Sequence, residues 1–135
     1  MNATSSLTVR DVMAPTLHIV DGLSTVREAI DRMREHHISS VVVDRRDSDD
    51  EYGIVVIHDV AEHIIGRNRS ADRTNVYEIM TKPVVSLDVA MNIRYAARLL
   101  FQLGLSRAIV TEHGDLVGVV TLRELVLRFI PDAAP

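Results

Sequence analysis

Apolar residues recur along this chain in short blocks whose spacing predicts a mixture of helices and strands. Between residues 26 and 33 they fall at i, i+3, i+4 and i+7, which places them on one face of a helix. Further helices are predicted over 59–66 and 121–129. Short apolar runs predict strands over 17–20, 40–43, 52–56, 84–87, 107–111 and 116–120. The pattern indicates an α/β fold.

The same pattern occurs twice. The run Val-Arg-Asp-Val-Met at 9–13 is similar to Val-Tyr-Glu-Ile-Met at 76–80, an offset of 76 − 9 = 67 residues. This offset places the apolar residues Val26, Ala29, Ile30 and Met33 on Ile93, Ala96, Ala97 and Leu100. The register predicts two β-α-β-β-α units, related by a pseudo-twofold axis and packed sheet to sheet.

Residues that begin and end helices support these boundaries. Thr25 with Glu28 forms the pattern of a capping box at the start of the helix in the first copy. In the second copy Asp88 is expected to cap the equivalent helix, and Gly104 is expected to end it. His113-Gly114-Asp115 predicts a tight turn between the last two strands.

The repeat also predicts the domain boundaries. One domain is expected over 7–66 and a second over 76–130, joined by a polar linker over 67–75. The linker is interpreted as a simple connection, and the alternative is that Arg67, Arg69 and Arg73 dock a partner. One copy of about 55 residues buries too little surface to be comfortably stable alone. The copies are therefore expected to pack together and to form a groove with two related sites.

Composition narrows the classes of function. The net charge of −4 and the small number of aromatic residues argue against a nucleic-acid binder. The chain has no cysteine, which excludes disulfides, thiolate metal sites and cysteine nucleophiles. No apolar run approaches the roughly 20 residues of a membrane span, and no leader peptide is visible. A cytoplasmic protein without a membrane partner is expected.

With the repeat in view, each copy resembles a cystathionine β-synthase (CBS) domain, and the tandem resembles a Bateman module of the stand-alone prokaryotic type. Besides the two leading runs, the resemblance rests on Gly-Ile-Val-Val-Ile-His-Asp at 53–59 and Gly-Val-Val-Thr-Leu-Arg-Glu at 118–124. It implies a non-enzymatic homodimer that requires no cofactor. Its effector would be AMP, ADP, ATP, NAD or S-adenosylmethionine, bound between the repeats. It would regulate a separate, unknown effector protein.

Each of the two copies departs from the family signature at a different position. It has a Thr or Ser at a strand-to-helix junction, where helix amides favour phosphate, and an Asp three residues on that can accept ribose hydroxyls. The first copy keeps Asp59 but has Val56 in place of the hydroxyl, whereas the second keeps Thr121 but has Glu124 as its acid. The alternative is that these residues only cap their helices. The pockets are therefore expected to be unequal.

By the same resemblance, Arg107, which aligns with Ser40, is the candidate for contacting a ligand phosphate. The alternative is a surface arginine or a salt bridge between the repeats. Candidates for lining the base pockets are Thr16, Leu17, His18, Val84 and Val85, with plain core packing as the alternative.

Metal and catalytic functions find little support in the sequence. Asp59 and His63 are four residues apart and could share a metal, but no third ligand is evident nearby. No nucleophile elbow, Walker loop or paired-histidine zinc motif is present. The rival to ligand sensing is a protein-interaction or scaffold module whose pockets have degenerated.

Overall fold

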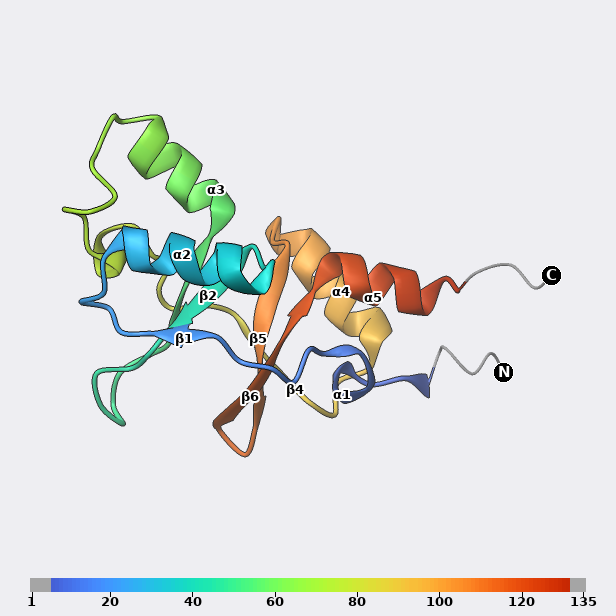
Figure 1. The fold of residues 1–135 in the computed structure, drawn as a ribbon. Coiled ribbons are helices and arrows are strands. Elements are labelled where there is room, and N and C mark those ends of the chain that lie inside the picture. Colours follow the sequence, from blue (N-terminus) through green and yellow to red (C-terminus); the bar gives the residue numbers. More distant parts are fainter. Residues whose placement is uncertain (1–5, 132–135) are drawn as a thin grey trace. The chain divides into compact units, whose positions relative to one another are not determined.

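The computed structural model describes residues 6–131, which divide into two compact units. The central unit comprises residues 18–84. The terminal unit combines residues 6–17 with residues 85–131. Each unit contains one three-stranded sheet with helices, as Figure 1 shows.

The central unit has the predicted β-α-β-β-α order. In its sheet β1 is parallel to β2, and β2 is antiparallel to β3. Its elements are β1 (Ile19–Val20), α2 (Val26–His36), β2 (Ser40–Val43), β3 (Gly53–Val56), α3 (Ile57–Val60), the π-helical η2 (Ala61–Ile65) and the 3₁₀ turn η3 (Val76–Glu78).

The terminal unit repeats this order with a short leading helix. Its sheet has the same arrangement, with β4 parallel to β5 and β5 antiparallel to β6. Its elements are α1 (Val9–Val12), β4 (Ser86–Asp88), α4 (Ile93–Leu103), β5 (Arg107–Glu112), β6 (Asp115–Thr121) and α5 (Leu122–Phe129). The predicted pair of α/β repeats is confirmed.

The leading segments are exchanged between the units. The Val9 amide of the first repeat donates to the Met91 carbonyl of the terminal unit at 2.8 Å. The Val76 amide of the second repeat donates to the Ser24 carbonyl of the central unit, also at 2.8 Å. Each compact unit therefore combines the leading segment of one repeat with the sheet and helices of the other. The sequence repeats and the compact units divide the chain at different residues.

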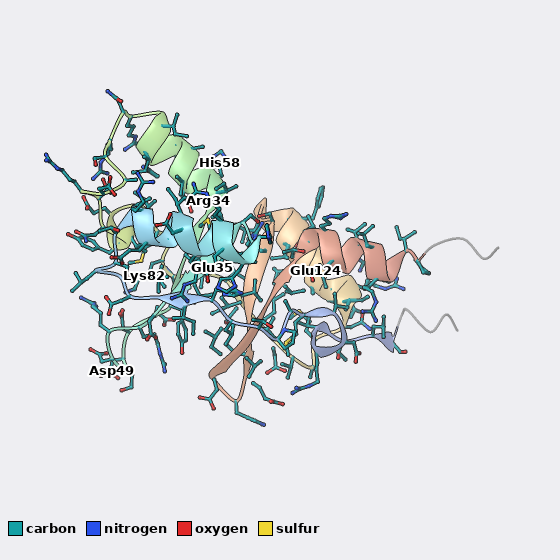
Figure 2. All side chains as sticks on the ribbon, in the orientation of Figure 1. Arg34, Glu35, Asp49, His58, Lys82 and Glu124 are labelled. Carbon is teal, nitrogen blue, oxygen red and sulfur yellow. The ribbon has the colours of Figure 1, made fainter. Side chains whose placement is uncertain are left out.

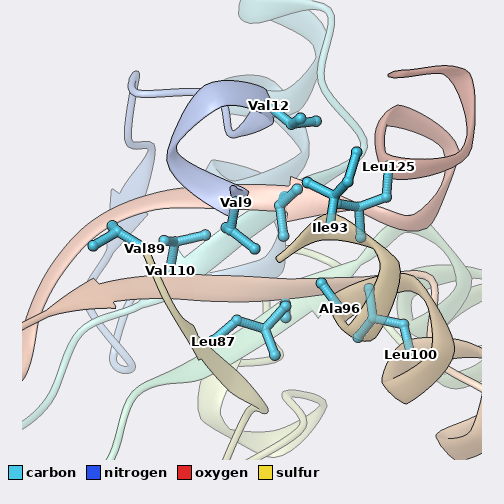
Figure 3. Close-up of a cluster of buried hydrophobic side chains, with 11 residues drawn as sticks. Val9, Val12, Leu87, Val89, Ile93, Ala96, Leu100, Val110 and Leu125 are labelled. Carbon is cyan, nitrogen blue, oxygen red and sulfur yellow. The ribbon is translucent and has the colours of Figure 1, made fainter. Parts of the chain in front are cut away.

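Each unit has its own hydrophobic core. In the terminal unit α1, α4 and α5 pack on the sheet through residues shown in Figure 3, among them Val9, Ile93, Leu100 and Leu125. In the central unit the core is built by α2, the strands and η3, with Val26, Val41, Val55 and Val76 fully or almost fully buried.

The structure confirms two of the predicted helix boundaries and corrects a third. The Glu28 amide donates to the Thr25 hydroxyl at 3.1 Å, and Gly104 ends α4 with φ of 68°. The prediction that Asp88 caps α4 is wrong. Asn92 caps that helix by accepting from the Arg94 amide at 2.8 Å, because Asp88 still belongs to β4 and its carboxylate accepts from the Ala90 amide of the intervening turn.

Three element starts differ from the sequence pattern. The first strand of each repeat starts two residues later than predicted, at Ile19 and Ser86, and the helix predicted over 59–66 starts at Ile57. The segment 67–75 packs on the start of α2, where Asp72 pairs with Arg27 at 3.0 Å. The segment is therefore a packed part of the central unit.

Candidate functional site

Each unit has a strand-to-helix junction at which the signature residues lie. In the terminal unit β6 runs directly into α5, and in the central unit β3 runs directly into α3. Figure 2 shows Glu124 at the start of α5 and His58 near the start of α3. The two junctions are locally similar in backbone but differ in side-chain chemistry.

At the terminal-unit junction, Thr121 and Glu124 form a complete capping box. The Thr121 amide and hydroxyl both donate to Glu124 Oε1, at 3.1 and 2.8 Å. The Glu124 amide in turn donates to the Thr121 hydroxyl oxygen at 3.1 Å. Thr121 and Glu124 therefore cap α5, and the capping box engages one of the two oxygens of the Glu124 carboxylate.

Arg107 starts β5 directly opposite Thr121 in the sheet register. Its side chain is partly buried. Burial lowers the pKa of the Arg107 guanidinium, and the nearby negative charge of Glu124 opposes that shift. A partly desolvated cation and a carboxylate thus lie at one junction. The Val85 carbonyl, which directly precedes β4, accepts from the Ile109 amide of β5 at 3.0 Å. Val85 therefore also lies beside the first residues of β5.

At the central-unit junction the hydroxyl is missing. Because Val56 offers no acceptor, α3 begins without a side-chain cap of the Thr121 type. The Asp59 carboxylate still accepts from the Val56 amide at 2.9 Å. Ser40 lies opposite Val56 in the sheet, and the His18 carbonyl accepts from the Val42 amide two residues along β2.

The structure thus distributes the predicted site residues between the units. His18, Ser40, Val56 and Asp59 come together in the central unit, whereas Val85, Arg107, Thr121 and Glu124 come together in the terminal unit. Of the remaining candidates, Thr16 and Leu17 belong to the leading segment of the terminal unit and Val84 to the central unit. None of the five candidates for the base pockets is fully buried, although Val85 packs against the terminal core.

The structure brings together a pair of histidines that the sequence does not indicate. The rings of His18 and His36 lie 4.4 Å apart, centroid to centroid, at an interplanar angle of 37°. Burial lowers the pKa of His18, and the positive charges of His36 and Arg32 act in the same direction. No pattern in the sequence could have indicated this pair, because it forms only where the residue before β1 meets the end of α2.

Neither a metal cluster nor a membrane span is found in residues 6–131. No group of three or more His, Asp or Glu side chains in this part of the chain is arranged to hold a metal ion. No helix within it is long and apolar enough to cross a bilayer.

The central unit also contains a hollow of about 610 Å³ where β1 and β2 end. Its lining includes Tyr77, Arg45 and Lys82. Lys82 pairs with Asp50 at 2.7 Å, and Arg46 pairs with the same carboxylate at 3.1 Å. Asp50 therefore ties the loop between β2 and β3 to the segment after η3.

We expect Asp50→Asn to lower the melting temperature most at neutral pH. Hydrogen bonds from Lys82 and Arg46 hold the pKa of Asp50 far below its ordinary value of 3.8. A lowered pKa stabilises the fold above the unfolded-state value, and this contribution is lost as pH falls below it. Thermal melts from pH 7 to pH 3 should show the difference between wild type and variant shrinking. Asp49→Asn is the matched control, and an equal loss in both variants would contradict the tie.

Comparison with known proteins identifies the family. The sequence profile of the CBS domain matches residues 9–66 and 76–130. The chain belongs to the CBS domain family. It carries two CBS domains, the arrangement of a Bateman module. Proteins of this family are generally regulatory rather than catalytic.

Three similar proteins represent its relatives. The uncharacterized protein MK0525 of Methanopyrus kandleri is 30% identical over 76% of this chain, which spans about half (52%) of that protein. The hexameric CBS-CP12 protein of bloom-forming cyanobacteria superposes with a TM-score of 0.87 at 27% identity, covering 92% of this chain and 72% of that one. CBSX2 in complex with AMP superposes with a TM-score of 0.69 at 25% identity, covering 89% and 93%.

Proposed function

We propose that this chain is a regulatory module that binds an adenosine-containing ligand and signals to a separate protein. Its two CBS domains are proposed to span 7–66 and 76–130. The observation that carries the proposal is the junction of Arg107, Thr121 and Glu124, where a partly buried cation lies beside a carboxylate. The AMP complex of CBSX2 supports this class of ligand.

The chemistry of the junctions suggests which part of a ligand each residue would bind. Arg107 would neutralise a phosphate, since a guanidinium forms charge-assisted hydrogen bonds with phosphate oxygens. The Glu124 carboxylate oxygen that is not engaged in the capping box would accept hydrogen bonds from ribose hydroxyls. Asp59 has a carboxylate in the equivalent place, but Val56 supplies no hydroxyl. We therefore propose that the two junctions are unequal and favour single occupancy.

The mechanism would be a shift between two arrangements of the module. A ligand changes their populations only by its difference in affinity for the two. A tenfold difference is worth about 1.4 kcal/mol, which sets the largest signal that such a ligand could pass to its partner.

We expect Arg107→Ala to weaken the binding of AMP, ATP or NAD by about tenfold, because a charge-assisted hydrogen bond contributes about 1.5 kcal/mol or more. Binding of S-adenosylmethionine, which has no phosphate, should change little. Isothermal titration calorimetry of wild type and variant with the four ligands measures both effects. Arg67→Ala removes an exposed arginine elsewhere and should leave every affinity unchanged.

Other outcomes of the titration would contradict the proposal. An absence of heat with all four ligands would rule out adenosine sensing. Unchanged affinity in both Asp59→Ala and Glu124→Ala would show that the ligand binds elsewhere. Glu124→Ala also removes a cap, so its melting temperature must be measured alongside.

The second candidate is a protein-interaction module without a ligand. It is favoured by the capping hydrogen bonds, since one carboxylate oxygen of each signature acid already accepts from the amide at the start of its helix. For either function we propose that the chain forms a homodimer. The hexameric assembly of the CBS-CP12 protein supports self-association in this fold.

A further inference from the structure

The hollow of the central unit lies at the opposite end of the sheet from the junction of Val56 and Asp59. It opens where the parallel strands β1 and β2 end, and every residue of its lining belongs to the central unit. The junction lies instead beside Ser40, the first residue of β2. Ligands of open α/β sheets bind beyond the carboxyl ends of parallel strands. The hollow is therefore a candidate binding site separate from the junction.

Part of the lining is apolar although it faces solvent. Tyr77 is 51% exposed and Leu23 is 74% exposed, and Met80 lies between η3 and Lys82 in the same lining. The Tyr77 amide donates to the Gly22 carbonyl at 3.0 Å, which holds η3 close to the end of β1. An aromatic ring and a thioether favour contact with a large apolar or aromatic group.

An acidic side is formed at the strand ends. Asp21 and Asp44 directly follow β1 and β2, which are paired in register, so the two residues lie on adjacent strand ends. Each carboxylate accepts from a backbone amide at 2.8 Å, Asp21 from Leu23 and Asp44 from Arg45. Among the ion pairs of residues 6–131, none includes Asp21 or Asp44. This side of the hollow can therefore accept an ammonium group.

A cationic side is formed by the loop between β2 and β3 and by the segment after η3. Arg45 lies over the Tyr52 ring at 4.8 Å, and no ion pair in the described part of the chain includes it. Lys82 and Arg46 share the carboxylate of Asp50. Together with Arg45, these cations outnumber the carboxylate that they share. This side of the hollow can therefore accept a carboxylate from a ligand.

The terminal unit fills the equivalent place. At the offset of 67 residues, Gly22, Arg45 and Tyr77 correspond to Val89, Glu112 and Arg10. The structure agrees with this match, because the Arg10 amide donates to the Val89 carbonyl as the Tyr77 amide does to that of Gly22. Arg10 pairs with Glu112, and Val89 is buried in the terminal core. The fold accommodates a valine and an ion pair at this place, so it does not itself require the hollow.

We propose that the hollow binds a small zwitterion with a large apolar side chain, the chemistry of a free amino acid or a dipeptide. Its ammonium would lie at Asp21 and Asp44, its side chain against Tyr77 and its carboxylate at Arg45, because a guanidinium binds carboxylates through paired hydrogen bonds. A ligand with one charge would leave the opposite side desolvated without a partner. The volume of about 610 Å³ suits a ligand of this size.

Blocked derivatives test whether both charges are recognised. In isothermal titration calorimetry, phenylalanine or phenylalanyl-phenylalanine should bind with a dissociation constant of about 1 mM or lower. The amide of the tighter probe lacks the carboxylate, and its N-acetyl derivative lacks the ammonium. Each should bind at least about tenfold more weakly, because each loses a charge-assisted hydrogen bond. The tighter of the two unblocked probes distinguishes an amino-acid site from a dipeptide site.

Two substitutions test whether the probe binds in the hollow. Gly22→Val introduces the side chain that the terminal unit carries at Val89. A Cβ at Gly22 would lie 3.6 Å from Tyr77 Cβ and 3.7 Å from Val43 Cγ1, which is ordinary contact, so the fold should persist. Binding should weaken at least about tenfold, because the valine occupies ligand space. Asp21→Asn keeps an oxygen for the turn but removes the charge, and should weaken binding about tenfold.

Asp88→Asn is the matched control. Asp88 is the equivalent of Asp21 in the terminal unit and likewise accepts from the amide two residues on, so its substitution should leave the affinity unchanged. Thermal melts establish that each variant is folded. The proposal would be overturned if neither unblocked probe bound, if a blocked derivative bound as tightly as its parent, or if Asp21→Asn left the affinity unchanged.

Titration with AMP separates this site from adenosine sensing. Gly22→Val should bind AMP as wild type does, because the hollow and the junctions share no residue. A wild type that binds the zwitterion but no adenosine-containing ligand would refute the proposed function and support the second site. Displacement of the zwitterion by AMP at a shared site would overturn the inference drawn from the hollow.

Discussion

Replacing Leu125 with alanine is expected to lower the free energy of unfolding by about 3 kcal/mol, since buried leucines lose between 2 and 5 kcal/mol on truncation. Leu125 lies on the inner side of α5, is fully buried and packs in the cluster with Val9, Ile93 and Leu100 (Figure 3). The loss combines the transfer free energy of the removed atoms with the cavity that they leave. Urea denaturation followed by circular dichroism measures it.

Leu127→Ala on the same helix provides the control. Leu127 is 55% exposed, so the same truncation should change stability by no more than about 0.5 kcal/mol. Both measurements should be made at one protein concentration, because self-association would add to the apparent stability. Similar losses at the two positions would contradict the orientation of α5 on the terminal core.

The second prediction concerns the exchanged leading segments. Val9→Ala should destabilise the terminal unit by about 2 kcal/mol, although Val9 belongs to the first sequence repeat. Its side chain is fully buried in the terminal core, and its amide donates to Met91. Hydrogen-exchange mass spectrometry should show faster exchange in β5, β6 and α5, with little change in β2 and β3.

Val76→Ala should give the opposite result. Val76 is the equivalent residue of the second repeat and is fully buried in the central core. Its truncation should therefore speed exchange in β2 and β3 and spare β5 and β6. If instead Val9→Ala loosened the central sheet, each repeat would hold its own leading segment and the exchange would be disproved.

The capping residues show what could be predicted locally. Thr25 was predictable because a capping box joins residues three apart, and Gly104 because a left-handed helix end favours glycine. The prediction of Asp88 failed for a related reason: Asp and Asn are both good caps, and sequence does not say where the preceding strand ends. Pairing with Thr111 keeps Asp88 in β4 and leaves Asn92 to begin α4.

Some features of the candidate site could likewise be located from the sequence, and others could not. The signature positions Asp59, Thr121 and Glu124 could be located from the repeat, because each is fixed by its distance from a glycine and a strand. The burial of Arg107 and the contact between His18 and His36 could not be located, since they depend on which strands become neighbours. The roles of the candidate residues in ligand binding remain predictions.

The sequence by itself determined the two α/β repeats, their element order and the departures from the CBS signature, because periodicity and spacing act within a repeat. Tertiary structure alone decided that α1 packs with the second repeat and η3 with the first. Val9 and Val76 occupy equivalent positions in equivalent patterns, so local preference cannot distinguish their two possible cores. That choice depends on packing and on backbone hydrogen bonds between residues far apart in the chain.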